Sequence, residues 1–182
     1  MRSVGPAGQR RNQRSGSARH AWFFVLKFLA CWLAFTGIVG FLPQIETVAV
    51  KATIATLRAL LTLSPGKSGA SGADTLFAGP VSFQIVTECT SLMPTLILWS
   101  AILAFPAPWR LRVRGLAIGA AGLWIYNLVR ILGLIPVMEY WPRGFEIIHV
   151  YLWQTTTLVV VMGFFFLWLR HMTPPVAPAR AR

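Results

Sequence analysis

The sequence predicts an all-α polytopic membrane protein with about four transmembrane helices, an amphipathic helix at the outer face and a short extended segment. Of its 182 residues, 55% are hydrophobic and 12% are charged, whereas a soluble domain carries about twice that charged fraction. The mean hydropathy is +0.61. Several stretches of about 20 residues are almost free of charge, which is the length that a helix needs to cross a bilayer.

Four apolar stretches are predicted to span the membrane: residues 21–42, 89–105, 115–135 and 146–169. The first lacks a following small-residue cleavage site, so we expect an uncleaved anchor rather than a signal peptide. Pro136 is predicted to end the third span, because proline removes a helical hydrogen bond. Together the spans define one membrane-embedded domain over residues 21–170.

Both ends of the chain are basic. Residues 1–20 combine five arginines with Gly, Ser and Gln, and they are predicted to form a disordered cytoplasmic tail. Residues 171–182 are predicted to form a second cytoplasmic tail, rich in proline and arginine. The net charge of +12 arises mainly from these tails and one short turn, with no aromatic-rich soluble module between them. We therefore expect no nucleic-acid partner.

The charge distribution predicts the orientation. With the N-terminus inside, twelve of the 17 Lys and Arg residues fall on the inner side, in agreement with the positive-inside rule. The acidic residues then fall outside or at the outer boundary: Glu46, Asp74, Glu88, Glu139 and Glu146. A fifth span over residues 46–63 would turn the basic turn at 110–114 outward. Four spans with both termini in the cytoplasm is therefore the predicted topology.

The segment before the second span is less apolar. Polar residues recur at helical spacing on one face of residues 46–63, which predicts an amphipathic helix lying in the outer interface. These residues are Thr47, Lys51, Arg58 and Thr62. Residues 64–74 are predicted to be a loop. Residues 81–85 alternate apolar and polar side chains, which predicts a short strand-like approach to Cys89.

Three residues with reactive or charged side chains fall at one depth. At 1.5 Å per helical residue, Cys89 lies roughly 30 Å from the inner boundary, Arg130 roughly 24 Å and His149 roughly 30 Å. Each alone has an ordinary explanation: a small apolar filler, a snorkelling arginine or an interfacial histidine. An arginine within an apolar run is nevertheless costly unless it is paired or hydrated. The convergence of all three near the outer leaflet predicts a functional site.

The chemistry of these side chains suits acyl transfer. A thiolate at Cys89 would attack an acyl carbon, and His149 would take the thiol proton and return it to the leaving amine. Arg130 would stabilise the oxyanion of the tetrahedral intermediate. Asn127, one helical turn before Arg130, would either orient the site or bond the backbone. Glu88 would either position His149 or mark the membrane interface.

Metal and cofactor sites are not expected. Cys31 and Cys89 should lie at different depths, so a disulfide between them is not predicted, and the cysteines and histidines lack metal-ligand spacing. Two other functions stay open. The chain could be a small transporter or channel subunit in which Arg130 and His149 line a polar path, or a structural membrane partner without chemistry.

The residues around the predicted site resemble a known family. TECTSL at Cys89, NLVRI at Arg130 and FEIIHVYLWQ at His149 resemble the three signature blocks of the exosortase/archaeosortase family, closest to the short exosortase H type. The resemblance covers residues 21–170. It implies a cysteine protease-transpeptidase of the bacterial inner membrane with its active site at the periplasmic face. Such an enzyme cleaves a C-terminal sorting signal (short motif, transmembrane helix, basic cluster) of exported proteins and transfers the acyl group to a cell-surface acceptor.

The resemblance assigns a role to each site residue. Cys89 corresponds to the nucleophile, His149 to the proton-transfer residue and Arg130 to the essential arginine. One position departs from the family pattern: Ser91 stands where a glycine is usual, and glycine would permit a closer backbone approach or an unusual dihedral angle. The partners implied are exported proteins, membrane lipid and an unknown surface acceptor. We further hypothesise that residues 46–63 form one wall of the substrate groove.

Overall fold

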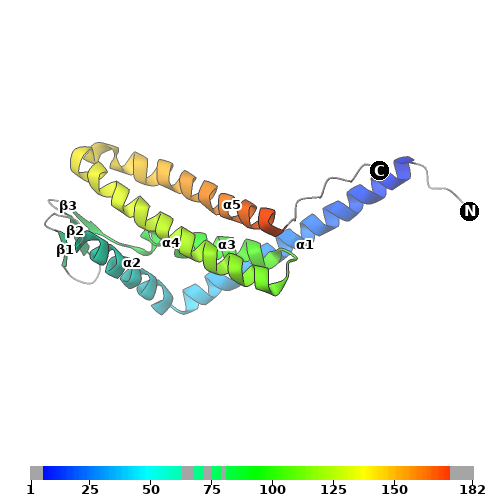
Figure 1. Ribbon diagram of the computed structural model, residues 1–182, viewed down its shortest axis with the longest axis horizontal. Coiled ribbons are helices and arrows are strands. Elements are labelled where there is room, and N and C mark those ends of the chain that lie inside the picture. Colours follow the sequence, from blue (N-terminus) through cyan, green and yellow to red (C-terminus); the bar gives the residue numbers. More distant parts are fainter. Residues whose placement is uncertain (1–5, 63–67, 72–74, 79–80, 173–182) are drawn as a thin grey trace, which may run out of the picture.

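The computed structural model describes residues 6–62, 68–71, 75–78 and 81–172. These residues form a predominantly helical, elongated molecule in which α4 and α5 make a long hairpin (Figure 1). A small sheet and α2 lie at the end where α4 turns into α5, and α1 extends beyond the opposite end (Figure 1). The α-helices are α1 Pro6–Phe41, α2 Gln44–Thr62, α3 Leu92–Ala104, α4 Trp109–Tyr140 and α5 Trp153–Met172.

Three helical segments in the described residues are long and apolar enough to cross a membrane: Arg19–Phe41, Trp109–Tyr140 and Ile147–Met172. They correspond to the first, third and fourth predicted spans, as expected for a helical membrane protein. The predicted second span, 89–105, is instead the 13-residue α3. At 1.5 Å per residue α3 is about 20 Å long, shorter than the roughly 30 Å of a hydrocarbon core.

The shortening of α3 has a local cause. Thr87–Cys89 form a separate 3-10 turn (η1) rather than the first turn of the helix. The Thr90 hydroxyl donates to the Thr87 carbonyl oxygen at 2.7 Å and accepts from the Leu92 amide at 3.3 Å. These local bonds offer the backbone an alternative to helical bonding. Cys89 therefore lies before α3 and not inside it.

Helix boundaries at the basic ends differ from the sequence prediction. The structure has helix from Pro6 onward where a disordered tail was predicted over residues 1–20. Alanine, glutamine and arginine, which favour helix, are frequent there, and proline is well tolerated at the first helical position. Residues 1–5 lie outside the described part of the chain. Of the second predicted tail, 171–182, α5 includes His171 and Met172, and residues 173–182 lie outside the described part.

Pro136 does not end α4, so this predicted boundary was wrong. The helix continues to Tyr140, and the Trp141 amide still donates to the Val137 carbonyl oxygen at 2.8 Å. Proline at this position removes one backbone hydrogen bond only, and the flanking turns of this long helix keep theirs. A 3-10 turn, Pro142–Gly144 (η2), then leads to the π-helical segment Ile147–Leu152 (η3), which runs directly into α5.

Helix α2 buries one face and exposes the other. Thr53, Ile54 and Leu57 are buried, whereas Lys51 and Arg58 are exposed. The helix packs against β1 and η1. It is not among the membrane-crossing candidates of the described chain, which agrees with its amphipathic pattern.

The sheet contains three antiparallel strands in the order β1-β2-β3: β1 Ser68–Ser71, β2 Thr75–Ala78 and β3 Val81–Gln84. Strand β3 coincides with the predicted strand-like segment. The prediction of a loop over 64–74 missed β1, whereas residues 64–67 and 72–74 lie outside the described part. The Gly- and Ser-rich β1 gains its strand conformation by pairing with β2, with Ser68 opposite Ala78, a non-local contact that β propensity does not reveal.

Two hydrophobic clusters stabilise the helical body. One joins Ile54 and Leu57 of α2 to Ile85 and to Leu128 and Ile131 of α4, and Cys89 packs against it. The other joins α3, α4 and α5 nearer the basic end, around Leu98, Ile102, Leu123 and Val161. The first cluster fixes the segment between β3 and α3 on the surface of α4. It thereby positions Cys89 beside the polar residues of that helix.

Candidate active site

Cys89 is held by backbone hydrogen bonds from two directions. Its amide donates to the Val86 carbonyl oxygen at 2.9 Å, which closes the η1 turn. Its carbonyl oxygen accepts a hydrogen bond from Asn127 Nδ2 at 2.7 Å. Asn127 lies on α4 and is only 4% exposed. Of the two roles that the sequence left open for Asn127, the structure has the backbone bond, and the backbone it binds is that of Cys89 itself.

Arg130 and His149 form the second pair. Arg130 Nη2 lies 3.2 Å from His149 Nε2. A guanidinium has donors only, so Nε2 must supply the lone pair and the ring proton must be on Nδ1. Arg130 is 7% exposed, and its Nε is buried without a hydrogen-bond partner among the described residues. Unsatisfied buried donors are rare in folded proteins, so this nitrogen marks Arg130 as an unusual buried group.

His149 belongs to the π-helical segment η3. Short π-helical turns are uncommon and occur frequently at functional sites. The ring of Phe145 stacks on the imidazole, with centroids 5.3 Å apart and planes inclined by 9°. The hydrogen bond from Arg130 holds one edge of the ring while Phe145 covers one face. The imidazole is therefore fixed in both position and tilt.

One cavity of about 300 Å³ is lined by both Cys89 and His149. Ser82 and Gln84 of β3 and Phe145 also line it, and the remaining walls are mainly apolar side chains of α4. Arg130 is not among the lining residues; it reaches the cavity through His149. The structure thus brings a thiol and an imidazole to one cavity, and the guanidinium bonds to the imidazole from outside its lining.

Glu88 is not brought to this cavity. Its side chain is exposed and lines a neighbouring, more polar cavity of about 430 Å³ together with Glu46 and Lys51. Thr87 Oγ1 donates to Glu46 Oε2 there at 3.4 Å. Gln84, Ile85 and Val86 line both cavities, so this segment forms the partition between them. The option that Glu88 orients His149 has no geometric support within the described residues.

Ser91, at the position where the resembling family usually has glycine, adopts an ordinary backbone conformation. Its φ is −82° and its ψ is 7°, which any residue can adopt. The side chain is 5% exposed. The serine therefore requires no unusual dihedral angle in this chain.

Two further residues were missed by the sequence analysis. Phe145 lies four residues before His149, a spacing at which helical side chains meet and which could have identified it. The Tyr126 hydroxyl lies 2.8 Å from Thr156 Oγ1 and 3.2 Å from Thr157 Oγ1, just after the π-helical segment. A tyrosine hydroxyl within an apolar span needs a polar partner. That requirement was the signal for Tyr126.

Metal-binding geometry is not found in the described residues: no group of three or more His, Cys, Asp or Glu side chains could hold an ion. Both cysteines are free thiols. No protein-family model matches the chain, and neither a curated protein nor a solved structure matches it.

Proposed function

We propose that the chain is a membrane-embedded cysteine protease-transpeptidase of the exosortase kind, which cleaves a C-terminal sorting signal of exported proteins. One observation carries the proposal: Cys89 and His149, far apart in sequence, line the same cavity. Asn127 and Arg130 lie one helical turn apart on α4. Asn127 donates a hydrogen bond to the Cys89 carbonyl oxygen, and Arg130 donates one to His149. A thiol, a general base and a hydrogen-bond donor in this arrangement suit acyl transfer.

The first half-reaction forms a thioester. The Cys89 sulfur bonds to the carbonyl carbon of the scissile peptide, and the thiol proton passes to the lone pair on His149 Nε2. The imidazolium has no lone pair left for Arg130, so proton transfer breaks that hydrogen bond. Arg130 does not line the cavity, so its released Nη2 donor would then have to move past the imidazole to stabilise the oxyanion. The carbon–nitrogen bond breaks, the leaving amine takes the proton from His149, and the acyl group stays on sulfur.

The second half-reaction restores the enzyme. A nucleophile of the cell-surface acceptor attacks the thioester carbon and gives its proton to His149. The carbon–sulfur bond breaks, the thiolate recovers the proton, and the acyl group leaves on the acceptor. Water in place of the acceptor would give hydrolysis by the same steps. No metal or cofactor takes part in this scheme.

The proposed site lies at the outer (periplasmic) face of the inner membrane, with both termini cytoplasmic, a topology that requires the segment from η1 through α3 to cross together with α1, α4 and α5. Its support is the basic residues at the opposite end of α4 and α5, which the positive-inside rule assigns to the cytoplasm. We include α2 as a wall of the substrate groove, because its buried residues Ile54 and Leu57 belong to the cluster against which Cys89 packs. Neutral replacements of Lys51 and Arg58 should then impair processing.

The test is processing of an exported reporter that carries a motif, an apolar helix and a basic cluster at its C-terminus. Cys89→Ala should abolish processing at unchanged membrane abundance, while Cys31→Ala, the matched control, should process normally. The transporter alternative makes the opposite prediction: solute flux that requires Arg130 and is indifferent to Cys89. Normal processing by Cys89→Ala would rule out the proposed function.

A further inference from the structure

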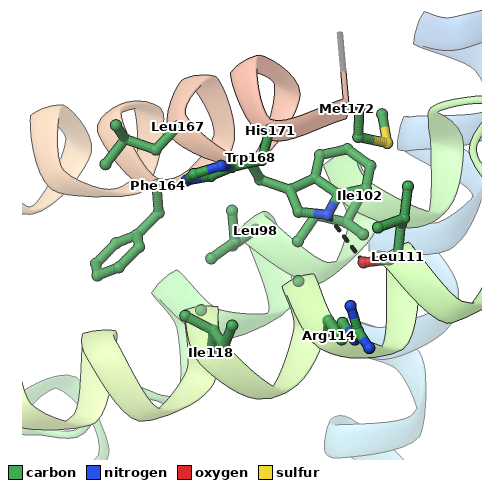
Figure 2. A pocket seen from close by; sticks show the side chains of 12 residues that line it. Leu98, Ile102, Leu111, Arg114, Ile118, Phe164, Leu167, Trp168, His171 and Met172 are labelled. Atoms are coloured by element: carbon green, nitrogen blue, oxygen red, sulfur yellow. Dashed lines mark hydrogen bonds between the residues drawn. The ribbon is translucent and has the colours of Figure 1, made fainter. Parts of the chain in front are cut away.

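A second apolar cavity lies away from the candidate active site, at the basic end of α4 and α5. Its volume is about 530 Å³. Leu98 and Ile102 of α3, Ile118 of α4, and Phe164 and Leu167 of α5 provide apolar walls. In Figure 2 Leu98 and Phe164 lie between the facing helices, with α5 on one side and α4 on the other. The space is shaped by three helices and is mainly apolar.

Small residues on α4 create the room for the neighbouring large side chains. A Cβ atom at Gly115 would collide with the indole of Trp168, and one at Gly119 would lie 2.5 Å from Leu98 Cδ2. The Trp168 indole is fixed by a hydrogen bond from Nε1 to the Leu111 carbonyl oxygen at 3.0 Å (Figure 2). The cavity therefore results from the packing of large side chains against glycines of α4, and the hydrogen-bonded Trp168 forms part of its boundary.

Arginine side chains lie at one edge of this apolar space and close to it. Arg114 and His171 line the cavity, and both are exposed. Arg110 and Arg170 are exposed at the same ends of α4 and α5. No acidic side chain is among the residues that line it. An apolar hollow with Arg114 at its edge and two more arginines nearby is complementary to a molecule with a hydrocarbon chain and an anionic head.

We propose that this cavity binds an anionic phospholipid, with an acyl chain against Ile118 and Phe164 and the phosphate at Arg114. Charge complementarity decides between the possible occupants. The basic cluster of a sorting signal, or the arginines of residues 173–182 of this chain, would be repelled by the same arginines. The positive-inside rule places the site in the cytoplasmic leaflet, where anionic lipids attract basic residues. The inference does not depend on the proposed catalysis.

The experiment measures lipid retention by the purified full-length chain in neutral detergent, using native mass spectrometry and titration with phosphatidylglycerol or phosphatidylcholine. One phosphatidylglycerol should be retained per chain, about tenfold more tightly than phosphatidylcholine. Arg114→Gln should weaken phosphatidylglycerol binding about tenfold, the scale of one charge-assisted hydrogen bond. Arg143→Gln, an exposed arginine at the opposite end of α4, is the matched control and should bind as the unmodified chain does.

A second variant tests the apolar part. Ile118→Trp should fill the cavity from its exposed side and abolish retention of both lipids, while processing of the reporter persists. Equal binding of the two lipids would overturn the proposal, as would equal effects of Arg114→Gln and Arg143→Gln. Unchanged retention in Ile118→Trp would also overturn it, since generic lipid around the helices does not require this cavity.

Discussion

The two ends of α4 line two mainly apolar cavities that differ in where their polar side chains lie. Near the sheet, the cavity is the smaller one, and the buried side chains of Asn127 and Arg130 bond to Cys89 and His149. At the basic end, the cavity is larger and mainly apolar, and its charged side chain on α4, Arg114, is exposed. Most buried polar groups in folded proteins have a hydrogen-bond partner. Exposed charge beside an apolar hollow instead suits a ligand that has both an apolar and a charged part. We propose chemistry at the first end and ligand binding at the second.

The largest expected effect is that of replacing His149, with a replacement of His171 as the control. His149→Ala should lower reporter processing by about 100- to 10,000-fold, because it removes the proton-transfer group. His171→Ala, which alters the exposed histidine at the lipid cavity, should process at the normal rate. Rates of reporter cleavage in matched membranes measure both. Equal losses in the two variants would mean that histidine at the sheet end has no special role.

The next effect concerns Arg130. Arg130→Ala should lower processing by about 100- to 1,000-fold, because the oxyanion loses its donor and His149 loses its positioning bond. The double replacement Arg130→Ala/His149→Ala should be no slower than the worse single variant, since residues that act as a unit are not additive. Arg114→Ala serves as the control at the opposite end. Multiplicative losses in the double variant would show that the two residues act independently.

A stability effect should distinguish Asn127. Asn127→Ala leaves the Cys89 carbonyl without its partner, so the free energy of unfolding should fall by about 1–3 kcal/mol. Gln154→Ala, at an exposed polar residue near the same end, should change it by less than about 0.5 kcal/mol. Denaturant titration in detergent measures both. The processing rate should fall as well for Asn127→Ala, because residue 89 is no longer held against α4.

The smallest expected effect is that of Tyr126→Phe. The ring contact with Trp153, at 6.1 Å between centroids, is retained, while the hydroxyl contacts with Thr156 and Thr157 are lost. The free energy of unfolding should fall by about 0.5–1.5 kcal/mol. If the π-helical segment depends on this anchor, processing should slow in proportion. Tyr151→Phe, an exposed tyrosine within η3, is the matched control and should change neither quantity.

Sequence reasoning predicted the depth of the site residues in the membrane better than the direction in which their side chains point. Counting residues along helices placed Cys89, Arg130 and His149 at one level, and the structure brings these side chains close together. Counting does not give the rotation of each helix, so it could not show that Arg130 faces the imidazole and lies outside the lining of the cavity. The resemblance assigned roles but no contacts. Phe145, by contrast, could have been identified from its four-residue spacing to His149.

The other differences between the predicted and the observed elements have local and non-local causes. Length and hydropathy suggested a span from residue 89, but Thr90 bonds the nearby backbone and delays the start of α3 to Leu92. Strand β1 depends on its pairing with β2, which no local pattern of Gly and Ser encodes. Pro136 was expected to stop α4, yet a helix long enough to lose one hydrogen bond continues past it.

The most direct test of the central claim is labelling of Cys89 in oriented inner-membrane vesicles. A membrane-impermeant thiol reagent would be applied from the outer face, with Cys31→Ala as the background. We expect rapid labelling at neutral pH that is slowed by His149→Ala and by Arg130→Ala but not by His171→Ala or Arg114→Ala. Labelling that is absent from the outer face, or equal in all four variants, would contradict it, because the thiol would then be uncoupled from the residues beside it.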